Sequence, residues 1–303
     1  MKTTSTLLLT ILFTLTLLAQ ANLSVGEEKK PLLRYPDIHE NQVVFVSGSD
    51  IWIANLANGE ARRLTIHDGE EMHPKFSPDG SLIAFTGEYD GNADVYVMNS
   101  EGGNITRLTY HPGFDEVIGW HPTENKILFN ARQYPGTGIL TSRMYAVPVE
   151  GGLPEPEILI ESSRGSYSPD GKQIAFNKTS REERTWKRYQ GGRAQDIYLY
   201  SLENYSEKQL TTFKGTDRIP MWVGDKIYFT SDRDGHLNLF SIDPENEELK
   251  QLTQHKSYDA RFPSAGKEKI VYEHGGDIWA LDLASEETQP LNISIGADAP
   301  EAR

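Results

Sequence analysis

The chain of 303 residues contains no cysteine. Disulfide bonds, thiolate metal sites and thiol nucleophiles are therefore excluded. Stability must come from the hydrophobic core, which a domain of about 280 residues is large enough to supply. Cationic residues are also scarce, with 30 Lys and Arg against 44 Asp and Glu and a net charge of −14. This acidic chain without a basic stripe disfavours nucleic acid and membrane surfaces as partners.

Long hydrophobic runs are missing except at the N-terminus. There Lys2 precedes an apolar run, Leu7–Leu18, which is followed by Ala19–Ala21. A basic residue, about 12 apolar residues and an A-x-A site are typical of a secretory signal peptide. A membrane anchor would need about 20 apolar residues. We therefore expect residues 1–21 to be a signal peptide and 22–31 a linker, in an exported protein that is periplasmic or secreted.

The mature chain lacks a sustained helical period, and its 14 Tyr, 11 Phe and 5 Trp favour strands. Three strand patterns recur six times each. The first occurs at 42–45 (QVVF), 82–85 (LIAF), 126–129 (KILF), 173–176 (QIAF), 226–229 (KIYF) and 269–272 (KIVY). The second occurs at 50–53 (DIWI), 94–97, 143–146, 196–199, 238–241 and 277–280. The third occurs at 62–65 (RRLT), 106–109, 157–160, 208–211, 250–253 and 289–292.

Each of the last five copies begins with a turn that an aromatic residue enters. These aromatics are Phe76, Trp120, Tyr167, Trp222 and Phe262. Four short strands about every 40–50 residues are typical of propeller blades. We predict an all-β fold, a six-bladed β-propeller over residues 32–295 with four antiparallel strands per blade. Since both end copies already contain four strands, we expect closure without a shared blade and no strand left over.

Two segments, TWKRYQGGRAQDIYLY (185–200) and DKIYFTSDRDGHLNLFS (225–241), resemble blades four and five of the N-terminal propeller of the tricorn protease family. The tail 296–303 resembles the start of the linker to a following domain. The resemblance implies a serine peptidase that trims oligopeptides, with its catalytic region beyond Arg303. For this propeller it implies a non-catalytic role as a substrate or product channel or filter. The implied partners are oligopeptides and the following domains of the same chain, and homo-oligomers are left open.

Two departures and an alternative accompany this resemblance. The stretch 109–120 (TYHPGFDEVIGW) lacks the arginine pair that anchors substrate carboxylates in tricorn, so that role is not transferred. The expected signal peptide also differs from a cytosolic protease. The alternative is a free-standing TolB-like periplasmic propeller that binds a protein, because such propellers share the SPDG turns. A carbohydrate-active propeller enzyme would need histidines and carboxylates clustered on one rim, and the sequence shows no such cluster.

Motifs for catalysis and metal binding are also missing. No G-x-S-x-G nucleophile motif occurs, so we assign no catalytic residue. The DRDG sequence at 232–235 has carboxylates at a calcium-loop spacing, but its position between two strands fits a hairpin turn better. The eight histidines show no zinc spacing. We expect no metal and no cofactor.

One insertion, between the QIAF and DIYL patterns, has functional promise. It concentrates cations in an otherwise acidic chain. The residues that we expect to contact a peptide or line a channel are Arg181, Arg184, Lys187, Arg188 and Arg193. Arginine forks bind carboxylates well. The alternative is a solvated loop or a loop that docks on an acidic partner domain.

Overall fold

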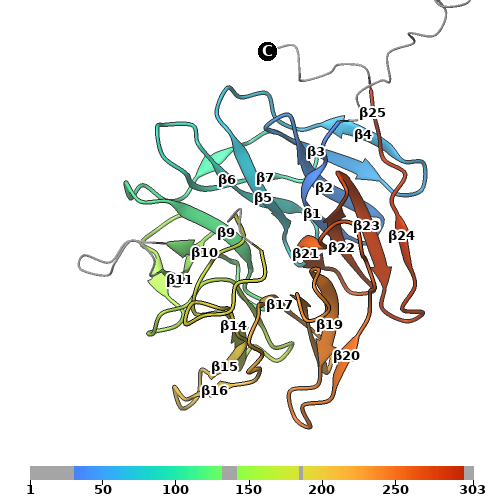
Figure 1. The fold of residues 1–303 in the computed structure, drawn as a ribbon. Helices are drawn as coiled ribbons and strands as arrows, with labels where there is room; N and C mark the ends of the chain where they lie inside the picture. The colour runs from blue at the N-terminus through green and yellow to red at the C-terminus, as the bar shows by residue number, and fades with distance from the viewer. Residues whose placement is uncertain (1–30, 132–141, 184–186, 297–303) are drawn as a thin grey trace, which may run out of the picture. The chain divides into compact units, whose positions relative to one another are not determined.

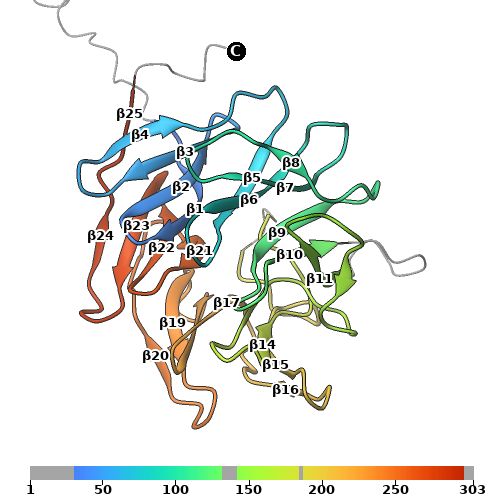
Figure 2. The same cartoon turned by 180° about the vertical axis from the view of Figure 1, so that it is seen from behind.

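A computed structural model describes residues 31–131, 142–183 and 187–296, and the expected signal peptide and the tail 297–303 lie outside them. In this part of the chain every regular element is a strand. The strands form six sheets, which Figure 1 shows as blades around a central axis and Figure 2 shows from behind. The all-β class and the six four-stranded antiparallel blades are as predicted. No helix long and apolar enough to cross a bilayer is found among the described residues.

The first three blades each consist of four consecutive strands. Blade 1 contains β1 (Arg34–His39), β2 (Gln42–Ser47), β3 (Asp50–Asn55) and β4 (Glu60–Arg63). Blade 2 contains β5 (Glu71–Phe76), β6 (Leu82–Gly87), β7 (Asp94–Asn99) and β8 (Thr106–Arg107). Blade 3 contains β9 (Asp115–Trp120), β10 (Lys126–Ala131), β11 (Arg143–Pro148) and β12 (Glu155–Pro156).

The last three blades follow the same order. Blade 4 contains β13 (Gly165–Tyr167), β14 (Gln173–Phe176), β15 (Tyr198–Ser201) and β16 (Glu207–Gln209). Blade 5 contains β17 (Asp217–Val223), β18 (Lys226–Ser231), β19 (Asn238–Ile242) and β20 (Leu249–Gln251). Blade 6 contains β21 (Arg261–Ala265), β22 (Lys269–His274), β23 (Asp277–Asp282) and β24 (Thr288–Pro290).

The second strand of each blade forms the centre of the core. Its pattern ends in an aromatic residue that has no exposed surface. These residues are Phe45, Phe85, Phe129, Phe176, Phe229 and Tyr272. They are covered on both faces because each blade packs between two neighbours, so the second strands are buried almost continuously rather than in alternation.

Five of the six fourth strands are shorter than predicted, and all six end before the position of the recurring Leu-Thr pair. The threonine of this pair has another role. Its hydroxyl oxygen accepts the backbone N–H of the second residue of the second recurring pattern in the same blade, at 2.8–3.0 Å. The pairs, each 14 residues apart, are Thr65 with Ile51, Thr109 with Val95, Thr211 with Ile197 and Thr253 with Leu239. The repeated threonine is thus explained by a buried backbone donor that needs an acceptor.

The ring closes where blade 6 meets blade 1. No blade is shared between the two ends, as predicted. The expectation that no strand would be left over is wrong, because β25 (Ser294–Ile295) pairs in parallel with β4 and adds a fifth strand to blade 1 (Figure 1). Gly59 has φ +76°, and a Cβ there would overlap the carbonyl oxygen of Asn292. The strand β25 has only two residues, which are too few to form a recognisable strand pattern, so counting strands in the sequence missed this pairing.

Candidate functional site

The first strands of the six blades surround an axial cavity of about 820 Å³, which we call the vestibule. Exposed residues of the turns after these strands, among them Glu40, Pro78, Pro169 and Lys267, form its rim. Its volume lies within the range of about 300–1,000 Å³ that is usual for ligand pockets. The vestibule therefore is the candidate functional site.

Six residues at equivalent positions line the vestibule below its rim. Each precedes the residue that enters the turn of its blade. They are Asp37, Lys75, Gly119, Ser166, Met221 and Ser264. In blade 6 the residue that enters the turn is Ala265, whose register with Ile270 matches that of Phe76 with Ile83. The assignment of Phe262 to this position is therefore wrong by three residues.

One wall of the vestibule is polar and belongs to blades 6, 1 and 2. Lys75 Nζ donates to Ser264 Oγ at 2.5 Å and lies 3.5 Å from Asp37 Oδ1, while Ser264 Oγ also donates to Asp37. The other oxygen of Asp37 accepts the N–H of Phe76 at 2.7 Å. Burial lowers the pKa of Lys75, and the Asp37 carboxylate partly opposes this shift. These bonds connect three blades across the closure.

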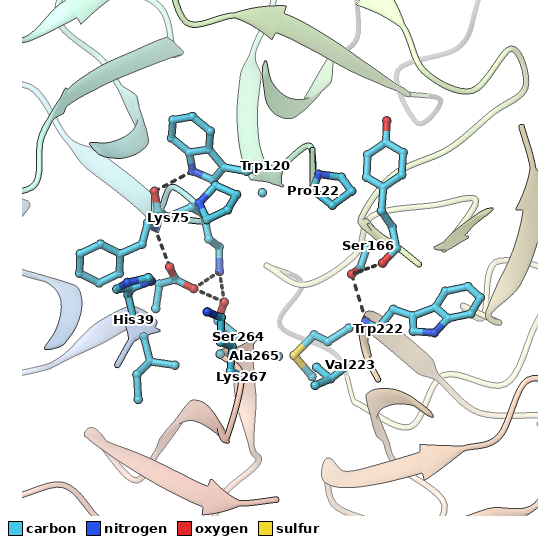
Figure 3. Close-up of a pocket in the computed structure, with 18 of the residues that line it drawn as sticks. His39, Lys75, Trp120, Pro122, Ser166, Trp222, Val223, Ser264, Ala265 and Lys267 are labelled. Atoms are coloured by element: carbon cyan, nitrogen blue, oxygen red, sulfur yellow. Dashed lines mark hydrogen bonds and ion pairs between the residues drawn. The ribbon is translucent and has the colours of Figure 1, made fainter. Parts of the chain in front are cut away.

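The opposite wall belongs to blades 3, 4 and 5 and is largely apolar. Ile118, Met221 and Trp222 line it, and Figure 3 shows Trp222 and Ser166 across the cavity from Lys75 and Ser264. Gly119 lies on this wall, and a Cβ added there would meet no atom within 4 Å. The vestibule is therefore wide on the side of Gly119 and has two chemically different walls.

Below the vestibule five side chains meet on the axis and form a ring that we call the waist: Tyr35, His73, Arg164, Ile219 and Phe262. The ring centroid of Tyr35 lies 4.2 Å from that of His73 and 4.7 Å from that of Phe262. Arg164 Cζ lies 5.8 Å from the centroid of Phe262. The cavity at this level is only about 10 Å³, which is about the space that one water molecule needs.

Backbone bulges aim four of the waist residues at the axis. At each bulge the register between the first and second strands shifts, φ lies between 43° and 55°, and proline follows. The four pairs are Tyr35-Pro36, His73-Pro74, Ile219-Pro220 and Phe262-Pro263. A non-glycine residue in this conformation costs about 1–3 kcal/mol, so the surrounding packing must hold it. This repeated X-Pro pair was a signal in the sequence that the repeat search missed.

An ion pair joins the waist to blade 3. Arg164 Nη2 donates to Glu116 Oε1 and lies 3.2 Å from His73 Nε2, which itself lies 2.9 Å from Glu116 Oε1. Burial lowers the pKa of His73, and the Arg164 cation adds to this effect while Glu116 opposes it. The neutral form of His73 is therefore favoured, and Arg164 supplies the cation that pairs with Glu116.

The described cations of the insertion do not line the vestibule. Lys187 Nζ lies 2.7 Å from Asp259 Oδ2, and Arg188 Nε donates to Gly235 O at 2.9 Å. Arg181 Cζ lies 5.7 Å from the centroid of the Tyr189 ring. Arg193 is exposed, and Arg184 lies outside the described residues. Lys187 and Arg188 thus hold the insertion on the loops of blades 5 and 6.

The insertion reaches the far side of the waist with acidic side chains instead. Tyr35 Oη donates to Glu183 Oε1 at 3.0 Å, and Glu182 Oε2 lies 3.9 Å from Arg164 Nε. Burial raises the pKa of Tyr35, and the neighbouring Glu183 carboxylate adds to this shift. Charge counting in the sequence selected the cations and missed these two glutamates.

The predicted turn at 232–235 is a hydrogen-bonded hairpin. Asp232 Oδ1 accepts the N–H of Thr216 at 2.8 Å, and the carboxylate of Asp234 accepts from Asn238 and Gln251. The carboxylates are thus occupied within the blade. Across the described residues, no group of three or more His, Cys, Asp or Glu is placed to hold a metal ion.

Comparison with known proteins agrees with the propeller geometry. The family model of the tricorn protease N-terminal beta propeller domain matches residues 30–287. The chain belongs to this family. It is 30% identical over 274 residues to tricorn protease homolog 1 of Streptomyces coelicolor, covering 87% of this chain and 25% of that protein. It is 28% identical to tricorn protease of Thermoplasma acidophilum, covering 90% of this chain and 26% of that protein.

Solved structures with a similar fold include the tricorn protease and a TolB protein. The crystal structure of the tricorn protease superposes with a TM-score of 0.77 at 26% identity, covering 86% of this chain and 26% of that chain. A putative TolB from Agrobacterium tumefaciens gives a TM-score of 0.65 at 19% identity, which shows a shared fold alone. The chain spans about a quarter of the length of the tricorn relatives that it matches.

Proposed function

We propose that this propeller is the non-catalytic peptide-binding domain of a longer tricorn-like serine peptidase, and that its vestibule receives oligopeptides. The vestibule is the observation that carries the proposal, because it is ligand-sized and accessible at the rim. Family membership supports the peptidase context. In this proposal the catalytic groups belong to other domains of the longer chain, and those domains are the propeller's partners.

The two walls of the vestibule suit an extended peptide. A peptide offers backbone donors and acceptors along its length together with apolar side chains. The polar wall around Lys75 and Ser264 supplies hydrogen-bonding groups, and the apolar wall around Met221 and Trp222 supplies surface for side chains. A pocket that is mainly apolar with a few fixed polar groups is the usual form of a ligand site.

Narrowing the vestibule is expected to weaken peptide binding. In the Gly119→Phe variant the new side chain enters open space, so the fold is retained while the cavity is occupied. We expect the affinity for a pool of random hexapeptides, measured by isothermal calorimetry, to fall by about tenfold or more, which is about 1.4 kcal/mol. Gly296→Phe is the matched control, because Gly296 also faces open space but lies beside β25 at the edge of blade 1. Equal affinities of the two variants would contradict the proposal.

The insertion remains a second proposed peptide contact, on the strength of its charge. Neutralising the exposed Arg188 and Arg193 to glutamine is expected to lower hexapeptide affinity by about two- to threefold, because exposed cations contribute little each. The same calorimetric measurement checks this, with Lys208→Gln on the outer strand β16 as the control. Unchanged affinity would remove the insertion from the site.

We also propose that the protein is exported, from the signal-peptide pattern of residues 1–21. N-terminal sequencing of the protein recovered from a periplasmic or culture fraction checks this, and a start at residue 22 is expected. The TolB-like alternative has only fold-level likeness in its favour. It predicts a stable protein partner, which the hexapeptides would not displace.

A further inference from the structure

The axial space narrows abruptly along the axis. The vestibule holds about 820 Å³, whereas the cavity enclosed between the waist side chains holds only about 10 Å³, about the space of a single water molecule. A peptide backbone with its side chains is far wider than a water molecule, since even two paired strands lie about 4.8 Å apart. No peptide passes the waist while its side chains hold the positions of this structure.

Separate blades contribute the residues that close the waist. Tyr35 comes from β1, His73 from β5 and Phe262 from β21, and their rings pack within 5.5 Å of one another. Arg164 approaches from blade 4 and is paired with Glu116 of β9. Opening the waist would therefore require several blades to give way together.

Both the backbone and the far side hold these rings in place. The bulges fix where Tyr35 and Phe262 point, and the following prolines restrict the backbone there. On the side away from the vestibule, Tyr35 Oη donates to Glu183 and Tyr35 N–H donates to Glu273 Oε1 at 2.8 Å. A rotation of the Tyr35 ring out of the axis would break its hydrogen bond to Glu183, while the Glu273 contact holds the Tyr35 backbone in place.

We infer that the vestibule is a pocket with a single entrance, in which one end of an oligopeptide enters from the rim and stops at the waist. The propeller is then a holder of peptide ends and not a passage from one face to the other. This differs from the channel that the family resemblance implies. The inference rests on the proposed function for the chemistry of its ligand, but the closure is a separate property of the waist.

The absence of cysteine allows a direct test with single-cysteine variants. Gly119→Cys places a thiol in the open part of the vestibule, and Arg261→Cys places one beyond the waist, one residue before Phe262. Random hexapeptides that carry a chloroacetyl group at the N-terminus, and a second pool with the group at the C-terminus, are reacted with each variant. Mass spectrometry measures the rates, and chloroacetamide gives the rate without peptide binding.

We expect at least one pool to modify Gly119→Cys about tenfold or more faster than chloroacetamide does, and neither pool to accelerate modification of Arg261→Cys. Acceleration at both positions would overturn the single entrance and leave the proposed function intact. No acceleration at either position would overturn both. Adding Tyr35→Ala and Phe262→Ala to Arg261→Cys is expected to introduce acceleration there. Loss of that gain in a folded variant, judged by its circular dichroism, would also count against the waist as the barrier.

Discussion

Replacing Asp37 with alanine is expected to lower the free energy of unfolding by about 3–5 kcal/mol, because it leaves a buried cation without its counter-ion. Asp37 is 6% exposed, and its two oxygens accept from Ser264 Oγ and the N–H of Phe76 and pair with Lys75 Nζ. These partners belong to blades 6 and 2, whereas Asp37 belongs to blade 1. The variant therefore weakens the contacts between blades where the ring closes, and urea-induced unfolding measures the loss.

A double variant separates the buried charge from the lost packing. In Asp37→Ala/Lys75→Met no cation is left unpaired, so we expect it to be more stable than Asp37→Ala alone by about 1 kcal/mol or more. The exposed pair of Lys250 and Glu286, with side chains 54% and 38% exposed, is the control. Glu286→Ala should cost less than about 1 kcal/mol. If Asp37→Ala costs no more than this control, the closure does not depend on the Asp37 contacts.

Replacing Glu71 with glutamine is expected to remove a large part of the pH dependence of stability. Glu71 lies at the start of β5 and is 1% exposed. Its oxygens accept the N–H of Ile51 at 2.9 Å and the hydroxyls of Thr65 and Tyr89. Burial raises the pKa of Glu71 to about 7, although these hydrogen bonds act in the opposite direction.

The sign of this pH effect follows from the raised pKa. Between the unfolded pKa of about 4.3 and the folded value near 7, the native protein keeps a proton that the unfolded chain has lost. The stabilisation is thus fully present below the unfolded pKa and is lost as pH rises through 7. From pH 5 to pH 8 the loss amounts to about 2–3 kcal/mol.

Urea unfolding at pH 5 and pH 8 checks this expectation. The difference between the two free energies should shrink by about 2–3 kcal/mol in Glu71→Gln, since glutamine does not titrate. Glu203→Gln is the matched control, because the Glu203 side chain is 68% exposed and should leave the difference unchanged. If Glu71→Gln keeps the full difference, another group dominates the pH dependence.

Much of the fold followed from local patterns in the sequence. The second and third strands of the blades were predicted from recurring runs of apolar and aromatic residues. Such runs recur because these strands are buried, as Phe85 and Phe229 are in two of the second strands. The fourth strands were poorly predicted, because they lie at the exposed outer edge and carry little hydrophobic pattern. The two-residue strand β25 had no pattern at all and is held by pairing with β4.

The candidate site was mostly invisible in the sequence for a different reason. Its residues come one from each blade, so contacting side chains such as Lys75 and Ser264 are 189 positions apart. The cations at 181–193 are close in sequence and were selected for that, yet Lys187 pairs with Asp259 on another blade. Closeness along the chain therefore does not select the residues that line the vestibule, which come from different repeats, and the contact of these cations with a peptide stays a prediction.

The sequence by itself determined the number of blades, the strand order and the family, because these depend on repeated local propensities and on hydrophobic patterns. Only the tertiary structure decided which residue of each first strand faces the axis. A bulge shifts the register of the first strand against the second by a residue and so changes which side chains face the axis. The bulges turn Tyr35, His73 and Phe262 inward. The closed waist exists only when these side chains, from blades far apart in the chain, meet at one point.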